Sequence, residues 1–378
     1  MHRRWTLRSR GHRVAAALLL AGTISLAGFG ATISLASPTA ESNGKTALTQ
    51  RMLSSLYTGP RLHIPAGPSP AVRGKTIGVV TLTSASEVFP RELAAIRAAA
   101  KVLGWTVKQA NMNGDVSQAG PAVENLLQEG VSGIITQSVE PNLFGAQAVA
   151  DAKAKHVPIV STFSGYVASD SKGVFAGSIT SDFTAIERAL DKHIVSDIGA
   201  GGQIALLNDV YASEGRIPEV ALRKDLAGKA DIVATHQMNY ANLVPDAFAT
   251  VSAWLTQYPN LKAVWCPYDG ACVGAAQAIQ AAHKSNVEVF SIDGVTSIIN
   301  FIRQGEKITT AAEPLEYSNW LAVDQLNSIF GHRKFTPTED VPGVIVDPAD
   351  VPKTGVIDGS QIYGNYVSAF KHRWGISG

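Results

Sequence analysis

The chain has 378 residues, charged residues make up 17% of them, and the formal net charge is +1 at pH 7. This balance gives no support for a nucleic-acid partner, because the sequence has no basic stripe interleaved with aromatic residues. The length allows two domains after a targeting segment is removed, and the alanine- and glycine-rich composition favours a layered α/β protein with closely packed helices.

The N-terminus predicts export. Residues 1–13 are basic without an acid, residues 14–36 are apolar and small, and the small residues around Ala36 suit a signal peptidase. We expect residues 1–36 to be a signal peptide, which places the mature protein in the periplasm or at the extracellular face of the cytoplasmic membrane. The apolar stretch is also long enough to span a bilayer, so an uncleaved anchor remains the alternative.

Residues 37–73 are expected to form an N-terminal extension that ends in a Pro- and Gly-rich linker. From residue 74 onward, apolar β-branched runs alternate with segments of helical periodicity, which is typical of parallel sheets covered by helices on both faces. In the first half, strands are expected at residues 76–82, 105–110, 131–137 and 157–163, and helices at 90–104, 117–130 and 142–155.

The alternation then starts again. Strands are expected at residues 202–208, 231–237, 261–266 and 287–293, and helices at 214–228, 245–258 and 270–283.

A local repeat relates the two halves. Residues 133–165 can be laid over residues 263–294, with a Gly-Ala-x-Ala helix start and a closing apolar strand at matching offsets. We therefore predict an α/β fold of two similar doubly wound lobes. The expected boundaries are 74–178 plus about 297–330 for lobe 1, 179–296 for lobe 2, and 331–378 for a C-terminal segment that packs across the lobes.

The two cysteines, Cys266 and Cys272, flank Asp269. A disulfide is chemically permitted in an exported protein, and a strand–loop–helix corner can bring the two residues close enough to bridge. Two buried thiols that pack as small hydrophobes are the equal alternative. Two thiols without a nearby pair of histidines do not make a zinc site.

Ligands of parallel α/β sheets bind at the carboxyl ends of the strands. The residues expected there are polar, mixed in charge and interleaved with aromatics, which suits a neutral polyhydroxylated ligand that packs on rings and hydrogen-bonds to charged groups. They are Ser84 to Phe89, Asn113, Asp115, Gln137 to Glu140, Phe163, Asn208, Asp209, Arg216, Asn239, Tyr240, Tyr268, Asp269 and Asp293.

Each of these residues also has a purely structural interpretation. Asp269 and Asp293 suit helix N-caps, a role that is compatible with a ligand contact. Arg216 suits a solvated helix position, and Phe89 and Tyr268 suit the core.

The sequence gives little sign of an enzyme or a cofactor. It has no glycine-rich phosphate loop after a strand, no His-Glu pair at metalloprotease spacing and no Gly-x-Ser-x-Gly elbow. A Ser-x-x-Lys pattern at residues 169–172 lies in a loop, and the histidines are scattered without metal-ligand spacing.

Four stretches carry a family likeness: "FPRELAAIRAAAKVLGWTVKQANMNGD", "LLQEGVSGIITQSVEPN", "YDGACVGAAQAIQAA" and "FSIDG…IRQGEKITTAAEP". In order and spacing they resemble the ribose/galactose-type sugar-binding proteins of ABC importers and the ligand domain of LacI-like repressors, over roughly residues 74–331. The resemblance implies a type I periplasmic-binding-protein fold whose lobes are joined by several hinge strands. An export signal stands where a repressor has its DNA-reading helices.

The resemblance also implies ligand-binding roles by position. Phe89 matches a stacking aromatic, Arg216 the sugar-binding arginine of the second lobe, and Asp293 the acid of a Phe-Asp-Gly turn. The remaining matches are Glu140 after the third strand, Asp269 in an Asn-Asp-x-x-Ala corner, and Glu313 where a hinge-side Gln is common. We expect Asp269 to cap its helix while its corner faces the cleft.

Three departures bear on the ligand: Tyr268 replaces Asn, Ile292 replaces an aromatic, and Glu313 replaces Gln. A modified sugar, a polyol or a ligand with a cationic group therefore fits as well as a plain pentose. The resemblance implies a monomeric, non-enzymatic receptor without a cofactor, which delivers its ligand to an ABC permease. A sensor subunit for a membrane receptor is the alternative.

Overall fold

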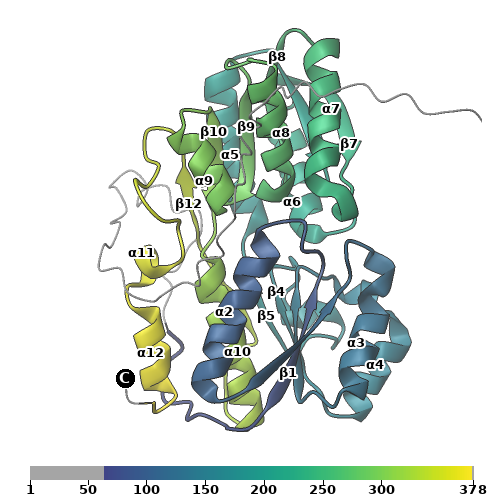
Figure 1. Ribbon diagram of the computed structural model, residues 1–378, viewed down its shortest axis with the longest axis vertical. Helices are drawn as coiled ribbons and strands as arrows, with labels where there is room; N and C mark the ends of the chain where they lie inside the picture. Colours follow the sequence, from purple (N-terminus) through teal and green to yellow (C-terminus); the bar gives the residue numbers. More distant parts are fainter. Residues whose placement is uncertain (1–63, 377–378) are drawn as a thin grey trace, which may run out of the picture. The chain divides into compact units, whose positions relative to one another are not determined.

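Two six-stranded sheets carry the fold (Figure 1). The structure is a computed structural model and describes residues 64–376. The predicted signal segment and most of the predicted extension lie outside the described residues. We refer to each sheet with its covering helices as a lobe.

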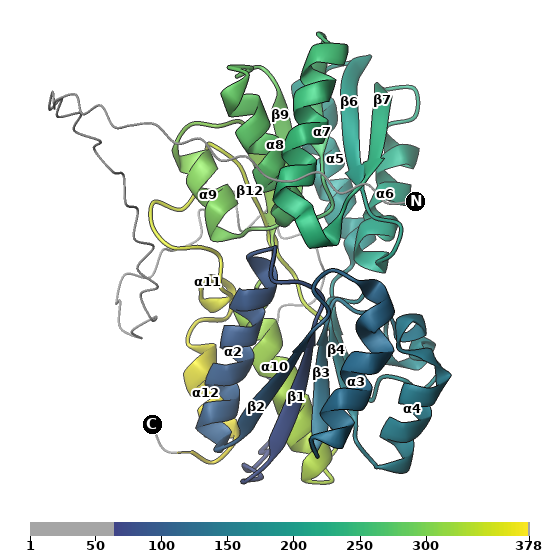
Figure 2. The ribbon, with the colours of Figure 1, turned by 45° about the vertical axis from the view of Figure 1, so that its right-hand side comes forward.

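The first lobe has the strand order β11-β5-β4-β3-β1-β2, and all its neighbouring strands pair in parallel. Helices α2 and α10 cover one face of this sheet, and α3 and α4 cover the other (Figure 2). Its elements are β1 (Thr76–Thr81), α2 (Val88–Leu103), β2 (Thr106–Asn111), α3 (Ala119–Gln128), β3 (Gly133–Gln137), α4 (Gly145–Ala154), β4 (Ile159–Thr162), β5 (Gly177–Thr180), α10 (Leu315–Phe330) and β11 (Thr338–Asp340), with short 3-10 turns at Val116–Gln118, Pro141–Phe144 and Ala168–Ser171.

The second lobe has the strand order β12-β10-β9-β8-β6-β7, in which only the edge strand β12 runs antiparallel to its neighbour. Its elements are α5 (Phe183–Ile198), β6 (Gly202–Asn208), α6 (Ser213–Asp225), β7 (Ala230–Gln237), α7 (Leu243–Gln257), β8 (Leu261–Trp265), α8 (Asp269–Ala281), β9 (Glu288–Asp293), α9 (Thr296–Arg303), β10 (Ile308–Ala312) and β12 (Val344–Val346), with a 3-10 turn at Tyr240–Asn242.

The predicted strand–helix alternation is confirmed in both lobes. Every residue of β3 is buried, as expected for a strand with helices on both faces. Helix α2 ends at Gly104, whose φ of 71° gives the left-handed C-cap that its position predicts. The doubly wound two-lobe architecture therefore follows from the pattern of apolar runs.

The chain crosses between the lobes three times, between β5 and α5, between β10 and α10, and between β11 and β12. One expected boundary is wrong. The sequence predicts residues 297–330 as one piece of the first lobe, but in the structure they divide between the two lobes. Strand β10 pairs with β9, from Ile308 opposite Val289 to Ala312 opposite Asp293. Both α9 and β10 thus belong to the second lobe, and only α10 returns to the first. An uninterrupted helix–strand–helix run contains no compositional signal for such a crossing.

The segment after residue 331 contacts both lobes. It contributes β11 to one sheet and β12 to the other, then forms α11 (Ser360–Tyr363) and α12 (Tyr366–Arg373). Arg373 Nε donates to Asp324 Oδ1 of α10 at 2.9 Å, and Trp374 stacks on Trp320 with ring centroids 5.5 Å apart. Arg303 of α9 donates to the carbonyl of Pro352 at 2.7 Å.

Candidate functional site

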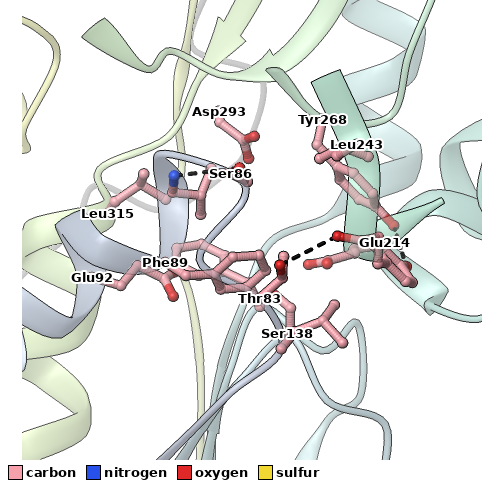
Figure 3. Close-up of a pocket in the computed structure, with 14 residues that line it drawn as sticks. Thr83, Ser86, Phe89, Glu92, Ser138, Glu214, Leu243, Tyr268, Asp293 and Leu315 are labelled. Carbon is pink, nitrogen blue, oxygen red and sulfur yellow. Dashed lines mark hydrogen bonds between the residues drawn. The ribbon is translucent and has the colours of Figure 1, made fainter. Parts of the chain in front are cut away.

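A pocket lies where the carboxyl ends of the strands of the two lobes meet (Figure 3). The first lobe supplies residues after β1, β3 and β4, and residues at the starts of α2 and α10. The second lobe supplies residues after β7 and β8, at the end of β9 and at the starts of α6 and α7. The lining residues are Leu82, Thr83, Ser86, Val88, Phe89, Glu92, Ser138, Phe163, Glu214, Tyr240, Leu243, Tyr268, Asp293 and Leu315.

Four aromatic side chains line this pocket: Phe89, Phe163, Tyr240 and Tyr268. The hydroxyl groups of both tyrosines donate to one oxygen, Oδ2 of Asp209. Burial raises the pKa of this carboxyl to about 6, against the effect of its hydrogen bonds. Asp209 therefore orients two phenol rings at the wall of the second lobe.

Three carboxyl groups also line the pocket: Glu92, Glu214 and Asp293. Burial raises the pKa of Glu92 to about 8. The pKa values of Glu214 and Asp293 lie well above the usual range, first because both groups are buried and then because other acids lie near them.

The backbone aims Asp293 into the pocket. Its φ is 117°, which side-chain-bearing residues rarely adopt. Gly294 follows with a φ of 73°, and a Cβ there would lie 2.4 Å from Cβ of Ala312. Only a glycine fits this corner at the end of β9.

Of the eight residues that the sequence analysis selected for ligand binding, Phe89, Tyr240, Tyr268 and Asp293 line the pocket. The other four, Glu140, Arg216, Asp269 and Glu313, do not line it. Each of these four instead contacts protein groups close to the pocket, as the next paragraphs describe.

Glu140 and Arg216 contact each other across the two lobes. Arg216 Nη2 donates to Glu140 Oε1 at 2.8 Å, and Ser213 Oγ donates to the same oxygen. Glu140 is almost fully buried, whereas the Arg216 side chain is 43% exposed. We call Glu140, Ser213 and Arg216 the clasp, because they join the start of α6 to the loop after β3.

A second contact joins the lobes on the side of α2. Glu87, just before α2, accepts hydrogen bonds from the backbone N–H groups of Thr296 and Ser297 at 3.0 and 3.1 Å, and from Ser297 Oγ at 2.8 Å. A carboxylate of the first lobe thus caps the N-terminus of α9 in the second, where the helix dipole favours negative charge.

The expectation that Asp269 caps its own helix is wrong. The N-cap of α8 is Tyr268, and its start has no side-chain cap. Asp269 is fully buried, and its carboxyl accepts hydrogen bonds from Ser291 Oγ, from Thr310 Oγ1 at 3.1 Å and from the Val295 N–H at 2.7 Å. It therefore ties α8 to β9, β10 and the start of α9. A carboxyl that follows a strand predicts a cap, and sequence alone does not show which donors fold back onto it.

Glu313 lies at the crossing between β10 and α10. Its Oε1 accepts from Ser181 Oγ at the crossing between β5 and α5, and Ser181 Oγ also lies 3.1 Å from the carbonyl oxygen of Val341 at the third crossing. Burial raises the pKa of Glu313 to about 7. The hinge-side position that the resemblance implies for Glu313 agrees with this geometry, and its contacts are with the hinge rather than with the pocket.

The cysteines flanking Asp269 form a disulfide between Cys266 and Cys272. The bridge spans the turn from β8 to α8, which carries Tyr268 into the pocket wall. Both cysteines are fully buried.

Sequence reasoning missed the pocket acids Glu92 and Glu214. Glu92 lies three residues after Phe89 on α2, so helical spacing places both on one face. Glu214 lies two residues before Arg216, on the first turn of α6. The sequence predicts that both residues lie on helices. It does not predict how these helices are oriented relative to the cleft.

Within residues 64–376, no helix is long and apolar enough to cross a membrane. The same residues contain no cluster of three or more His, Cys, Asp or Glu side chains arranged to hold a metal ion.

Comparisons with known proteins agree with this geometry. A family model, the periplasmic binding protein domain, matches residues 77–331. The chain is 26% identical over 243 residues to the xylitol-binding protein of Mycolicibacterium smegmatis, covering 63% of this chain and 68% of that protein. It is 25% identical over 292 residues to the ribose import binding protein of Bacillus subtilis, covering 76% and 93%.

The fold is similar to that of an ABC transporter solute-binding protein from Agrobacterium vitis with bound D-fucose. The TM-score is 0.68 at 18% identity, and the match covers 76% of this chain and 99% of the other. A solute-binding protein from Mycobacterium smegmatis with bound glycerol gives a TM-score of 0.66 at 22% identity, covering 74% and 96%.

Proposed function

The chain belongs to the periplasmic binding protein family, and on that premise we propose that it captures a small polyhydroxylated ligand, a sugar or a polyol, between its two lobes. The observation that carries the proposal is the pocket itself, which combines four aromatic side chains with hydroxyl and carboxyl groups at the strand ends of both lobes. Aromatic faces pack on the C–H faces of sugars, and the polar groups fix the directions of the hydroxyls.

The ligand enters by separation of the lobes. The cavity at the lobe boundary has a volume of about 20 Å³, which holds about one water molecule, so a sugar-sized ligand requires the lobes to move apart. The three crossings near Ser181, Glu313 and Val341 provide the hinge. On closure, the clasp and the Glu87 contact form across the lobes, and the ligand-bound closed form is selected by its extra contacts.

The closed form delivers its ligand to an ABC permease. Support comes from the family, from the name of the Bacillus subtilis relative as an import binding protein, and from the export signal that the sequence predicts at residues 1–36. The protein acts as a monomer on the outer side of the cytoplasmic membrane.

A thermal-shift screen of the processed protein against sugars and polyols tests this function. A ligand that binds only the folded state raises the free energy of unfolding, by about 2.7 kcal/mol at a ligand concentration of 100 Kd, and so raises the melting temperature. Phe89→Ala should abolish the shift, whereas Phe248→Ala, a half-exposed phenylalanine outside the pocket, should keep it. If no sugar or polyol shifts the melting temperature, or if Phe89→Ala binds like the wild type, the proposal is wrong.

A further inference from the structure

The three pocket carboxyls face a site without a basic side chain. Glu92 comes from α2, Glu214 from α6 and Asp293 from the end of β9, and Figure 3 places them on different sides of the pocket. Their exposed fractions are 0%, 8% and 7%. Among the lining residues there is no lysine, arginine or histidine.

The arginines nearest the pocket are already paired. Arg91 makes two 2.9 Å hydrogen bonds with the carboxylate of Glu316 and one of 3.2 Å with the carbonyl of Gly294, and Arg216 is held by Glu140 in the clasp. The two arginines are outnumbered by the acids in and around the pocket, which are Glu87, Glu92, Glu140, Asp209, Glu214, Asp269, Asp293, Glu313 and Glu316.

The pocket acids also have few donors. Oε2 of Glu92 accepts from Gln137 Nε2 at 3.0 Å, while Oε1 has no hydrogen-bond partner among the described residues. Asp293 accepts one backbone N–H, from Asp269, at 3.1 Å. Glu214 accepts a hydrogen bond from Ser138, but burial outweighs its effect on the pKa. Burying a carboxyl group is costly, and burial is the main reason why the pKa values of all three groups are raised.

We propose that the ligand carries a protonated amine, as in an amino sugar or an aminopolyol, and that this ammonium group binds between Glu92, Glu214 and Asp293. An ammonium offers three donors and no acceptor, which complements three carboxyl groups that line one pocket with no basic side chain and with one oxygen of Glu92 unpartnered. The aromatic rings of Phe89, Phe163, Tyr240 and Tyr268 attract a cation as well as a sugar face. The hydroxyl groups of Thr83, Ser86 and Ser138 also line the pocket.

This inference rests on the proposed function and narrows it. Matched probes separate the two: D-glucose, D-glucosamine and N-acetyl-D-glucosamine form one series, and xylitol and 1-amino-1-deoxyxylitol form the other. We expect the amine of at least one series to bind about tenfold or more tightly than its neutral partners, the ratio typical of a hydrogen bond to a charged group.

Calorimetry gives an independent readout. Binding of an ammonium next to carboxyls that hold protons favours their ionised form, so the wild-type protein should release protons at pH 7, seen as a binding enthalpy that depends on the ionisation enthalpy of the buffer. A neutral sugar or polyol should show no such release.

Charge-removing variants locate the effect. Glu92→Gln and Glu214→Gln should each weaken binding of the amine by about tenfold more than they weaken binding of its neutral partner. Glu187→Gln is the matched control, because Glu187 is a fully buried acid of α5 that accepts from Trp265 Nε1 at 3.2 Å and does not line the pocket. Glu187→Gln should bind the amine and the neutral probes as tightly as the wild type does.

The outcomes are distinct. If neutral probes bind as tightly as their amines, or if amines bind without proton release and equally well to Glu92→Gln, the amine inference is overturned while the sugar-binding function stands. If no probe of either series binds, the amine inference is overturned, and the proposed function is decided by the wider screen of sugars and polyols.

Discussion

The carboxyls that line the pocket differ from the carboxyls around it. Asp269, Glu87 and Glu140 each accept two or more hydrogen bonds from identified donors. Of the acids that line the pocket, Glu92 keeps one oxygen without a partner and Asp293 accepts one backbone N–H. A raised pKa does not separate the two groups, because burial also raises the pKa of Asp269 to about 7. Carboxyls whose oxygens already have donors hold parts of the fold together, whereas the pocket carboxyls keep oxygens available for the ligand that we propose.

The largest effect expected on folding is that of Asp269→Ala. The change leaves two hydroxyls and one backbone N–H without their buried acceptor, so we expect the free energy of unfolding to fall by about 3–5 kcal/mol, measured by urea denaturation. Asp182→Ala, which removes an exposed N-cap on α5, should cost about 1 kcal/mol. If both variants lose the same free energy of unfolding, Asp269 contributes no more than an exposed helix cap does.

Removal of the disulfide should have the next largest effect. Replacing Cys266 and Cys272 together by alanine frees a short loop of the unfolded chain, so we expect a loss of about 2 kcal/mol in the free energy of unfolding. Ligand affinity should change little, because neither cysteine lines the pocket. If ligand affinity falls while the free energy of unfolding is unchanged, the disulfide stabilises the geometry of the pocket rather than the fold.

Opening the clasp should have a smaller effect. Arg216→Ala removes a partly exposed ion pair, so we expect ligand affinity to weaken by about 1 kcal/mol through loss of closed form. Arg223→Ala is the control, because Arg223 makes an exposed ion pair with Glu219 within α6 and should leave affinity unchanged. A far larger loss with Arg216→Ala would place Arg216 in direct contact with the ligand, as its family position implies.

The pH dependence of stability should show the buried acids of the pocket and the hinge. The pKa of Glu92 is raised from 4.5 to about 8 and that of Glu313 from 4.5 to about 7, chiefly by burial. The folded state therefore binds more protons than the unfolded state from a pH near 4.5 up to these raised values, and the stability that this provides is lost as the pH rises through that range.

Without ligand, the melting temperature should accordingly fall as the pH rises from about 5 to about 8. Glu92→Gln should flatten the profile, and Asp115→Asn, at an exposed turn, should leave its slope unchanged. A melting temperature that rises over this range would contradict the raised pKa values.

Much of the fold was predictable because its signals are local. Apolar runs such as residues 131–137 mark buried strands, and Gly104 marks the end of a helix. The boundary near residue 297 was not predictable, because the crossing after β10 depends on which sheet accepts the strand.

The site was predictable only in part. Phe89, Tyr268 and Asp293 follow from their places at strand ends and helix starts. Glu140 and Arg216 occupy the expected positions but bind each other, since both lobes contribute to one closed contact. The sequence predicts that Asp269 accepts hydrogen bonds from its own helix, but its donors come from β9, β10 and the start of α9, which are distant in the sequence.

Ligand-dependent closure is the most direct test of a capture receptor. The only two cysteines of the chain form a disulfide, so two introduced cysteines at the exposed Ala154 of the first lobe and Ala227 of the second can carry spin labels. The ligand found in the screen should shift the label-to-label distances to one narrow, shorter distribution, and Phe89→Ala should remove that shift. A distance distribution that is unchanged at saturating ligand would contradict capture by closure of the lobes.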